Sequence, residues 1–399
     1  MLKAWLSYIF DPRAHIKHFG HRLGIPKVDN RIDSQNPSHI AIFVAFASIL
    51  SKSNQYYISA LNEAGYSIVY INNAKTEEVC IPILKELTWL AFDRINTGRD
   101  FGAYQDGVLF LQKEGYFSSC KTLCMANDSM QFIPGLFSNS FVDAIKNFQS
   151  GKKLALFSHG SQQVHSHYQS YFQIIKAKIF NSKPYQNFWR SYVPLNHRGH
   201  CINNGEIALS KKVYRIFPDS QLLYRSDLLA QEIHNIKRKN MLTPFYLNAC
   251  LRLMPLMDRT IALKNVSQSL EDIICRSKGN QEISEIDIAK ICEFIELSNP
   301  SHMAAFLYPF FLQCPLVKHD LCLAGTFNYG HAILLFSEMI HLSLGINNPT
   351  QQAMDCIDEF RERLFSKGVA SDYSDRPYTA IKNGIHGGFV YPQPFPGLR

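Results

Sequence analysis

The sequence predicts an α/β fold in which a mainly parallel sheet is flanked by helices and followed by a helical C-terminal region. Apolar, β-rich segments alternate with helical patterns up to about residue 214, whereas strand patterns become rare beyond about residue 228. Apolar residues make up 46% of the chain and charged residues 19%, which suffices for a core of ordinary size. A chain of 399 residues also exceeds what one core usually supports, so we expect more than one domain.

The strand and helix patterns give the order of the elements. Strands are predicted at residues 40–46, 66–71, 89–95, 122–126, 153–157 and 168–177. Helices are predicted between them at 55–64, 77–87 and 206–214, and the segment from residue 96 begins as a loop and runs into a helix through about residue 113. Further helices are predicted at 228–239, 242–257, 268–277, 284–296, 301–313, 330–343 and 350–365. We therefore expect a basic N-terminal segment (1–35), a sheet domain (36–260) and a helical region with an irregular tail (261–399).

The cysteines and the apolar runs bear on the compartment of the protein. The sequence has ten cysteines and no pair with C-x-x-C spacing, which favours a reducing, cytoplasmic environment. The longest apolar run, 40–50, is 11 residues long, whereas a spanning helix needs roughly 20. We expect neither a membrane span nor a secretory signal.

The formal net charge is +8, and residues 1–31 contribute six Lys/Arg against two Asp. Aromatic residues are interleaved with these basic residues, a pattern that suits peripheral contact with an anionic membrane surface. The alternative is a solvated helix that packs on the body of the protein. The basic residues form no continuous stripe and no nucleic-acid-binding motif occurs, so we expect no nucleic-acid partner.

The first candidate for chemistry is Asn127-Asp128-Ser129, at the end of a predicted strand. Open α/β sheets bind ligands at the carboxyl ends of their strands. The carboxylate of Asp128 can hold a divalent cation, which would neutralise charge on phosphate oxygens. The alternative is a strand-terminal Asp that forms an Asx-turn.

The second candidate is Arg99-Asp100-Phe101-Gly102, which begins a predicted helix. The guanidinium of Arg99 suits phosphate oxygens, and Asp100 can accept a hydrogen bond from a ribose or a base. Gly102 permits a close backbone approach. The alternative is a capped helix with an internal Asp–Arg pair.

The third candidate is a polar loop that is followed by two further histidines. Its members are His165, His167, Gln169 and Ser170, and His197 and His200 come after it. The His-x-His spacing is compatible with a metal, but no Cys or carboxylate cluster accompanies it. We therefore favour hydrogen bonding to a substrate over a zinc site.

The fourth candidate is Glu206, in the first turn of a predicted helix after Asn203-Asn204-Gly205. A carboxylate at this position can match the helix dipole, or it can be a general base that takes the proton of an acceptor hydroxyl. Position alone leaves both interpretations open.

These segments match one family pattern in order and spacing. Residues 94–107 contain Asn-Thr-Gly-Arg-Asp-Phe-Gly-Ala-Tyr-Gln-Asp-Gly, and Asn-Asp-Ser follows at 127–129. His167-Tyr-Gln-Ser-Tyr-Phe172 precedes Phe188-Trp189, and the last block is Asn204-Gly-Glu-Ile-Ala-Leu-Ser210. Over roughly residues 38–260 the chain thereby resembles the rhamnan synthesis F family of bacterial glycosyltransferases.

The resemblance implies a GT-A-like domain with a Rossmann-type sheet, a nucleotide-sugar donor, often dTDP-rhamnose, and a lipid-linked or growing polysaccharide acceptor. It implies that Asp128 is a catalytic ligand of Mg²⁺ or Mn²⁺. Ser129 stands where the Asp-x-Asp metal motif has its second Asp, so the donor diphosphate would hold most of the metal. In the last block the family has Tyr before its Glu, where this chain has Gly205.

The resemblance also assigns roles to the candidate residues. Contacts to the donor are expected from Asn96, Arg99, Asp100, Gly102 and Asn127, contacts to the sugar or acceptor from His167, Gln169 and Ser170, and the base is expected to be Glu206. The leading hypothesis is thus a glycosyltransferase of capsule, O-antigen or lipopolysaccharide synthesis, in the cytoplasm or at the inner face of the plasma membrane. The alternatives are a non-catalytic carbohydrate- or nucleotide-binding module and a scaffold of a polysaccharide assembly complex. The sugar, the linkage and the stereochemical outcome depend on pocket shape rather than on these motifs.

Overall fold

The computed structural model describes residues 23–31, 36–161, 166–239, 299–323, 329–345 and 350–368, with single positions at 284, 286–287, 289–290 and 327. The described residues form two compact units. The first comprises those up to Asp128 together with Ala144–Ser158 and His167–Leu223, and the second comprises the others. The expected boundaries at 35 and 260, the helices expected at 242–257 and 268–277, most of the helix expected at 284–296 and nearly all of the expected tail lie outside the described residues.

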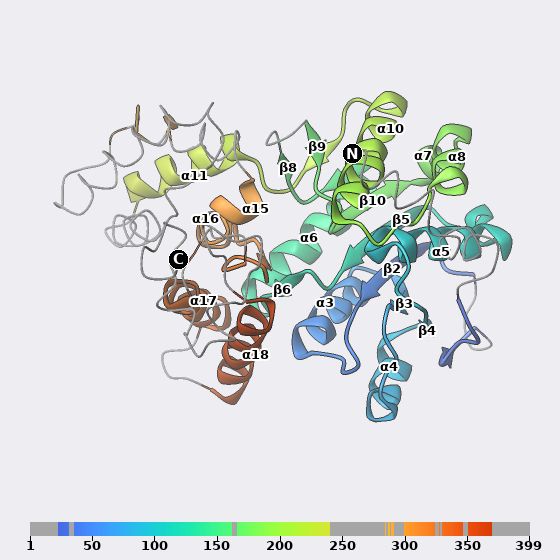
Figure 1. Cartoon of the computed structure of the whole chain (residues 1–399). Coiled ribbons are helices and arrows are strands. Elements are labelled where there is room, and N and C mark those ends of the chain that lie inside the picture. Colours follow the sequence, from blue (N-terminus) through green and yellow to red (C-terminus); the bar gives the residue numbers. More distant parts are fainter. Residues whose placement is uncertain are drawn as a thin grey trace, which may run out of the picture. The chain divides into compact units, whose positions relative to one another are not determined.

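The first unit is built on an eight-stranded sheet of order β1-β4-β3-β2-β5-β10-β7-β11 (Figure 1). The strands are β1 (Val28–Asp29), β4 (Leu90–Asp93), β3 (Ser67–Asn72), β2 (His39–Ala45), β5 (Thr122–Asn127), β10 (Phe172–Lys176), β7 (Ala155–Phe157) and β11 (Gln221–Leu222). The pairs β4–β3, β3–β2, β2–β5 and β7–β11 are parallel, while β10 runs antiparallel to β5 and β7, and β1 to β4. This mixed, mostly parallel sheet confirms the predicted fold class.

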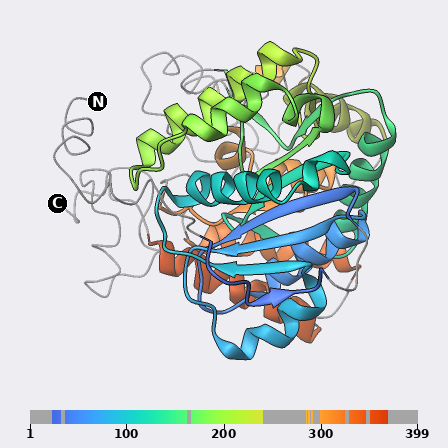
Figure 2. The same cartoon turned by 90° about the vertical axis from the view of Figure 1, so that its right-hand side faces the viewer.

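The interior positions of the central strands β2, β3 and β5 are apolar because helices cover both faces of the sheet. Ile42 and Ile71 face α5 (Arg99–Lys113), and a Cβ added at Gly107 of that helix would stand 2.9 Å from both of their side chains. Phe43 points to the opposite face, where its ring packs edge-on against Tyr57 of α3 (Lys52–Glu63), with centroids 5.4 Å apart. Figure 2 shows α5, in teal, lying along the blue strands.

Further short elements complete the first unit. They are η1 (Glu78–Cys80), α4 (Ile81–Leu87), η2 (Tyr116–Ser118), β9 (His167–Tyr168), α7 (Ala177–Phe180), α8 (Lys183–Ser191), α9 (Arg198–His200), the π-helix η3 (Cys201–Ile207) and α10 (Ala208–Ile216). The six predicted strands are all present, although the one expected at 168–177 is limited to β10, with β9 before it. Helix α8 is an addition, whose buried residues Tyr185, Phe188 and Trp189 span little more than one turn.

The strand order reverses at the pair β2–β5. The chain runs from β2 to β3 and β4 on one side and then returns to β5 on the other side, and such a reversal is where open α/β sheets bind ligands. Because β10 is antiparallel to β5, its first residue, Phe172, pairs with Ala126 near the end of β5. The segments that follow β2, β3, β4 and β5 and the segment that precedes β10 therefore meet at one edge of the sheet.

The second unit is mainly helical. Its elements are β6 (Met130–Phe132), α11 (Ser226–Lys239), α15 (Pro300–Met303), α16 (Leu307–Leu312), β12 (Leu316–Lys318), α17 (Tyr329–Leu344), α18 (Gln351–Lys367), the short strand β8 (Gly160–Ser161) and the first half of α6 (Leu136–Ser150). The predicted helices at 228–239, 330–343 and 350–365 are confirmed, and the one at 301–313 is divided into α15 and α16. Helix α6 was not predicted. The antiparallel pair β6–β12 was also not predicted, because three-residue strands carry little pattern.

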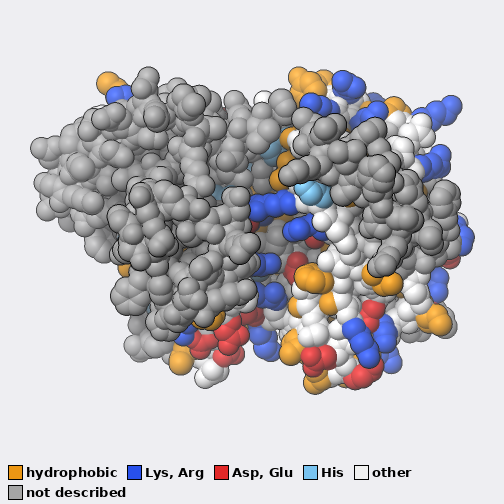
Figure 3. All heavy atoms as spheres, in the orientation of Figure 1, with side chains coloured by type: hydrophobic (Ala, Val, Ile, Leu, Met, Phe, Trp, Pro, Cys, Tyr) orange, Lys and Arg blue, Asp and Glu red, His pale blue; other side chains and the backbone are white. Residues whose placement is uncertain are grey.

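Two features of the described residues bear on the environment of the protein. None of the helices in the described ranges is long and apolar enough to cross a membrane. The cysteines in these ranges are free thiols, and all but Cys201 are buried. On the face drawn in Figure 3, basic and acidic side chains lie beside one another on the described surface.

A buried ion pair fixes α5 to the loops at the carboxyl edge. Arg94, directly after β4, donates from Nε to Asp106 of α5 at 2.8 Å and from Nη2 to the carbonyl of Thr97 at 2.8 Å, and Nη1 donates to the side chain of Asn73. The side chains of Arg94 and Asp106 are 0% and 7% exposed. The pair thus ties the β3 and β4 loops to the helix that begins at this edge.

We predict that Asp106→Ala lowers the free energy of unfolding by about 3–5 kcal/mol, because it leaves the guanidinium of Arg94 buried without a carboxylate. Urea denaturation of the purified protein measures the change. The control is Asp219→Ala, which removes the exposed partner of Lys153 and should cost at most about 1 kcal/mol. Equal losses in the two variants would contradict the prediction.

Candidate functional site

The amide of Asn127 links the end of β5 to the start of α5. Its Nδ2 donates to Oδ2 of Asp100 at 3.3 Å. The hydroxyl of Tyr104, one helical turn beyond Asp100, contacts the same Asn127 side chain and donates to the backbone carbonyl of Ser170 at 3.4 Å. Burial raises the pKa of Tyr104 well above its usual value, and the negative charge of Asp100 acts in the same direction. Tyr104 is therefore a protonated donor that connects two sides of the site.

Asp128 lies where the strand order reverses. Its backbone N–H donates to the carbonyl of Val44 at 3.0 Å, and its Oδ2 accepts from the N–H of Phe46, after β2, at 2.8 Å. The negative charge of Asp128 also contributes to the raised pKa of Tyr104, so this carboxylate lies near that hydroxyl. The structure thus brings Asp100, Asn127 and Asp128 together.

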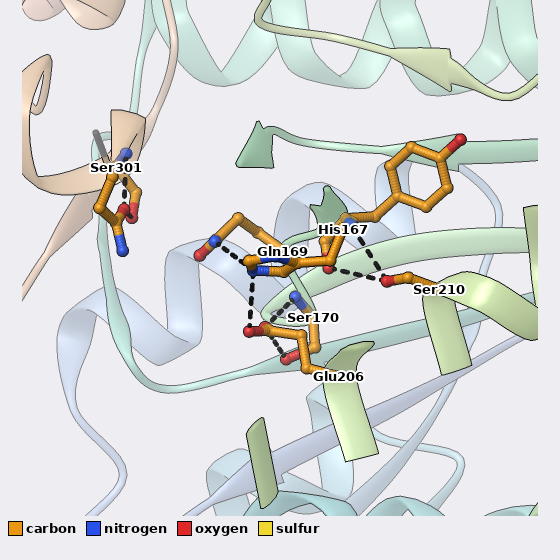
Figure 4. Close-up of polar contacts among 8 residues, drawn as sticks. His167, Gln169, Ser170, Glu206, Ser210 and Ser301 are labelled. Atoms are coloured by element: carbon orange, nitrogen blue, oxygen red, sulfur yellow. Dashed lines mark hydrogen bonds and ion pairs between the residues drawn. The ribbon is translucent and has the colours of Figure 1, made fainter. Parts of the chain in front are cut away.

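Glu206 binds the loop that precedes β10 (Figure 4). Its Oε2 accepts hydrogen bonds from Ser170, at 2.8 Å from the backbone N–H and 2.6 Å from the hydroxyl. Its Oε1 lies 3.3 Å from Nε2 of His167, and the amide nitrogen of Gln169 lies 3.2 Å from the same ring nitrogen. The side chains of His167 and Glu206 are 5% and 15% exposed. The predicted acceptor residues therefore form one connected group.

The surroundings of Glu206 decide its ionisation. Burial by itself raises the pKa of the carboxyl, but hydrogen bonds from His167 and Ser170 and the proximity of the His167 ring outweigh burial. The pKa of Glu206 is therefore lower than its usual value, and the group is an ionised carboxylate at neutral pH.

The prediction that Glu206 stands in the first turn of a helix is wrong. Helical structure begins at Arg198, and Glu206 is the sixth residue of the π-helix Cys201–Ile207. The helix-dipole explanation for this carboxylate therefore does not apply. A Cβ added at Gly205 would stand 2.8 Å from the ring of Phe101, so glycine lets the π-helix approach α5 closely. π-Helical turns inside α-helices are frequent at functional sites.

The predicted donor residues before α5 form a tight turn. Gly98 and Arg99 both adopt left-handed backbone conformations, with φ of 78° and 54°, and Arg99 is exposed at the start of α5. The side chain of Asn196 holds this turn, since its Oδ1 accepts from the N–H of Gly98 at 2.6 Å and its Nδ2 donates to the carbonyl of Asn96 at 3.0 Å. Arg99 and Asp100 thereby lie at the same edge as Asp128, whereas Asn96 contributes its backbone to the turn.

The structure gives Gly102 an internal role. A Cβ at this position would stand 2.0 Å from the carbonyl oxygen of Thr97, so glycine is needed for the turn to close on α5. A contact between Gly102 and a ligand stays a prediction.

His197 and His200 belong to a local helix start. Nδ1 of His197 accepts from the N–H of His200 at 3.2 Å, and Nε2 of His200 lies 2.7 Å from the carbonyl of Val193. His165 lies outside the described residues. Over the described ranges, no group of three or more His, Cys, Asp or Glu residues could hold a metal ion by itself.

The carboxylates of this site could therefore supply only one or two of the ligands of a bound cation. Asp100 and Asp128 both lie near the hydroxyl of Tyr104, and each offers carboxylate oxygens of the kind that Mg²⁺ and Mn²⁺ prefer. Magnesium commonly keeps several waters and binds one or two carboxylates together with phosphate oxygens of the substrate. The site is compatible with that mode of binding and not with a closed protein cage.

Sequence reasoning missed three contributors to this site. Tyr104 had a usable signal, because it lies four residues after Asp100 and so on the same face of α5. Asn196 had none, because it contacts the turn across 98 positions of sequence. The N–H of Phe46 could not be found from residue type, because it is a backbone group.

Comparisons with known proteins follow the same part of the chain. Residues 68–235 match the family model of "Rhamnan synthesis protein F". The "Uncharacterized protein y4gN" of Sinorhizobium fredii is 28% identical over 188 residues, which are 46% of this chain and 48% of that protein, so the chain spans about half the length of this relative. A structural match to the solved glycosyltransferase GlyE of Streptococcus pneumoniae TIGR4 covers 52% of this chain and 51% of the GlyE chain. The sequence identity is 11% and the TM-score is 0.30. Residues 68–235 of this chain are therefore similar to the rhamnan synthesis protein F family.

Proposed function

We propose that this protein is a glycosyltransferase that moves a sugar, with rhamnose as the first candidate, from a nucleoside-diphosphate donor to a growing or lipid-linked bacterial surface polysaccharide. The observation that carries the proposal is the continuous chain of contacts at the carboxyl edge of the sheet. It runs from Asp100 through Asn127 and Tyr104 to Ser170, and from there to Glu206. The similarity of residues 68–235 to a rhamnan synthesis family supports the same reaction class.

The end of this series of contacts that holds Asp100 and Asp128 is the proposed donor site. A divalent cation bound by Asp128, and by Asp100 beside it, would offset the charge that builds on the departing diphosphate. Arg99 is exposed at the same edge, where its guanidinium can pair with phosphate oxygens. The first N–H groups of α5 point toward this edge and favour an anionic ligand.

The other end of this series of contacts, at Glu206, is the proposed acceptor site. Glu206 is the proposed base, and its lowered pKa keeps it in the ionised form that a base requires at neutral pH. The same low pKa makes it a weak base, so we propose that His167, 3.3 Å away, shares the proton taken from the acceptor hydroxyl. Ser170 holds the carboxylate in place, and the side-chain amide of Gln169 lies beside the imidazole.

A non-catalytic carbohydrate- or nucleotide-binding module is the second candidate. It is favoured by the two hydrogen bonds from Ser170 to Glu206 and by Ser129 in place of a second metal-ligating Asp. Donor hydrolysis or sugar transfer by the purified protein separates the two candidates, because a binding module would perform neither.

We predict that Asp128→Asn weakens binding of nucleoside diphosphates about tenfold or more and removes most of its dependence on Mg²⁺ or Mn²⁺, because one carboxylate charge on the cation is lost. Calorimetric titration with dTDP and UDP, with metal and with EDTA, measures both effects. The control is Asp219→Asn. Asp219 is exposed and is not one of the candidate site residues, so this variant should bind like the wild type. If Asp128→Asn bound nucleoside diphosphates as tightly as the wild type, Asp128 would not be a ligand of the cation.

We also predict that Tyr104→Phe lowers kcat/KM of sugar transfer about tenfold, because it removes the hydroxyl that joins Asn127 to Ser170 while keeping the ring. Steady-state kinetics with a nucleotide-sugar donor test this. Tyr214→Phe removes a hydroxyl from a residue that is 56% exposed on α10 and should leave the rate unchanged. A rate for Tyr104→Phe equal to that of Tyr214→Phe would argue against a coupled site.

The pH dependence of stability should report on Glu206. Because its folded pKa is lower than the usual value of 4.5, the stabilisation is complete above pH 4.5 and is lost as the pH falls through the folded pKa. Glu206→Gln should therefore be less stable than the wild type at pH 7, and the difference should shrink below pH 4.5. Urea denaturation at pH 7 and in steps below pH 4.5 measures this difference, and a difference that stays constant or grows in acid would contradict the assignment.

A further inference from the structure

Phe46 is an exposed aromatic residue at the point where the strand order reverses. It follows the last residue of β2, and its side chain is 57% exposed, whereas Phe43, Val44 and Ala45 before it are fully buried. Its backbone N–H donates to Oδ2 of Asp128 at 2.8 Å. The aromatic side chain therefore leaves the backbone directly beside the carboxylate that we propose as the cation ligand.

The loop that carries Phe46 is held firmly by its neighbour. The side chain of Asn72, at the end of β3, donates to the carbonyl of Ala47 at 2.8 Å and accepts from the N–H of Ala47 at 3.4 Å. The carbonyl of Ser48 accepts from the N–H of Glu77 at 2.9 Å. The position of Phe46 is thus fixed by hydrogen bonds of its own N–H and of the two residues that follow it, rather than by burial of its ring.

An aromatic ring in water contributes little to folding, but it contributes substantially to binding when a flat ligand covers it. Every nucleobase has a π-face that can stack on such a ring, and the gain does not depend on which base it is. Ile49, in the same loop, is 56% exposed and aliphatic, so it offers similar apolar area without a π-face.

We propose that Phe46 stacks on the nucleobase of the donor, with the diphosphate directed toward Asp128. This inference rests on the proposed function, because it assigns the base end of the same nucleoside-diphosphate site. The ring then supplies affinity for any nucleoside diphosphate, and discrimination between bases comes from other groups.

The test compares Phe46→Ala with Ile49→Ala in the full-length protein. Calorimetric titrations with dTDP, UDP and inorganic pyrophosphate, each with Mg²⁺, separate the base from the phosphates. Phe46→Ala should weaken binding of both nucleotides about tenfold or more and leave pyrophosphate binding unchanged. Ile49→Ala should bind all three ligands like the wild type. Phe46→Trp should keep nucleotide affinity, and its fluorescence should be quenched by dTDP and not by pyrophosphate.

Two results would overturn the stacking role. One is nucleotide affinity of Phe46→Ala equal to that of the wild type, and the other is an equal loss for nucleotides and pyrophosphate, which would assign Phe46 to loop geometry. Phe46→Leu, which keeps apolar volume and removes the π-face, should weaken nucleotides as Phe46→Ala does. Circular dichroism and urea denaturation confirm that each variant folds. A wild-type protein that binds pyrophosphate but no nucleoside diphosphate contradicts the inference, whereas one that binds none of the three ligands contradicts the proposed function itself.

Discussion

The antiparallel pairing of β10 with β5 is the constraint on which the candidate site depends. The register Phe172 to Ala126 places the segment before β10 at the carboxyl end of β5, where Asn127 and Asp128 follow. A shift of one residue would turn the side chains of β10 to the opposite faces of the sheet. The register is enforced by burial, because Phe172, Ile174 and Ile175 are fully buried between the two covering layers. One strand pairing thus brings the loop bound by Glu206 to the carboxylates.

Helix α5 shows how a signature motif divides its residues between structure and chemistry. Arg94 and Asp106 form the buried pair, Gly102 and Gly107 permit close contacts, and Gln105 donates to the carbonyls of Trp189 and Tyr192 at 2.7 Å. Asp100 and Tyr104, one turn apart, contact the polar residues at the sheet edge. Much of the segment that resembles a ligand-binding signature therefore holds the helix in place.

The sequence was sufficient for six of the eight strands of the sheet and for placing several candidate residues at one edge of it. The runs at 40–46, 66–71 and 122–126 are apolar apart from Ser67 and Thr122, and such runs are typical of strands buried on both faces. Polar residues directly after those runs are therefore expected at one edge of the sheet. The π-helix could not be predicted, because it depends on Phe101 fitting against Gly205 across about a hundred positions. For the same reason the predicted position of Glu206 within its helix was wrong, although Glu206 does contact Ser170 and His167.

Arg99 has a backbone conformation that glycine adopts without strain and that other residues adopt at some energetic cost. Selection for thermal robustness alone would favour glycine at this position, next to the glycine that already precedes it. Under the proposed function, Arg99 exchanges a small loss of fold stability for a cationic side chain beside the donor phosphates. Natural variation at this position would then separate chains that have kept the anion-binding task from chains that have kept only the architecture.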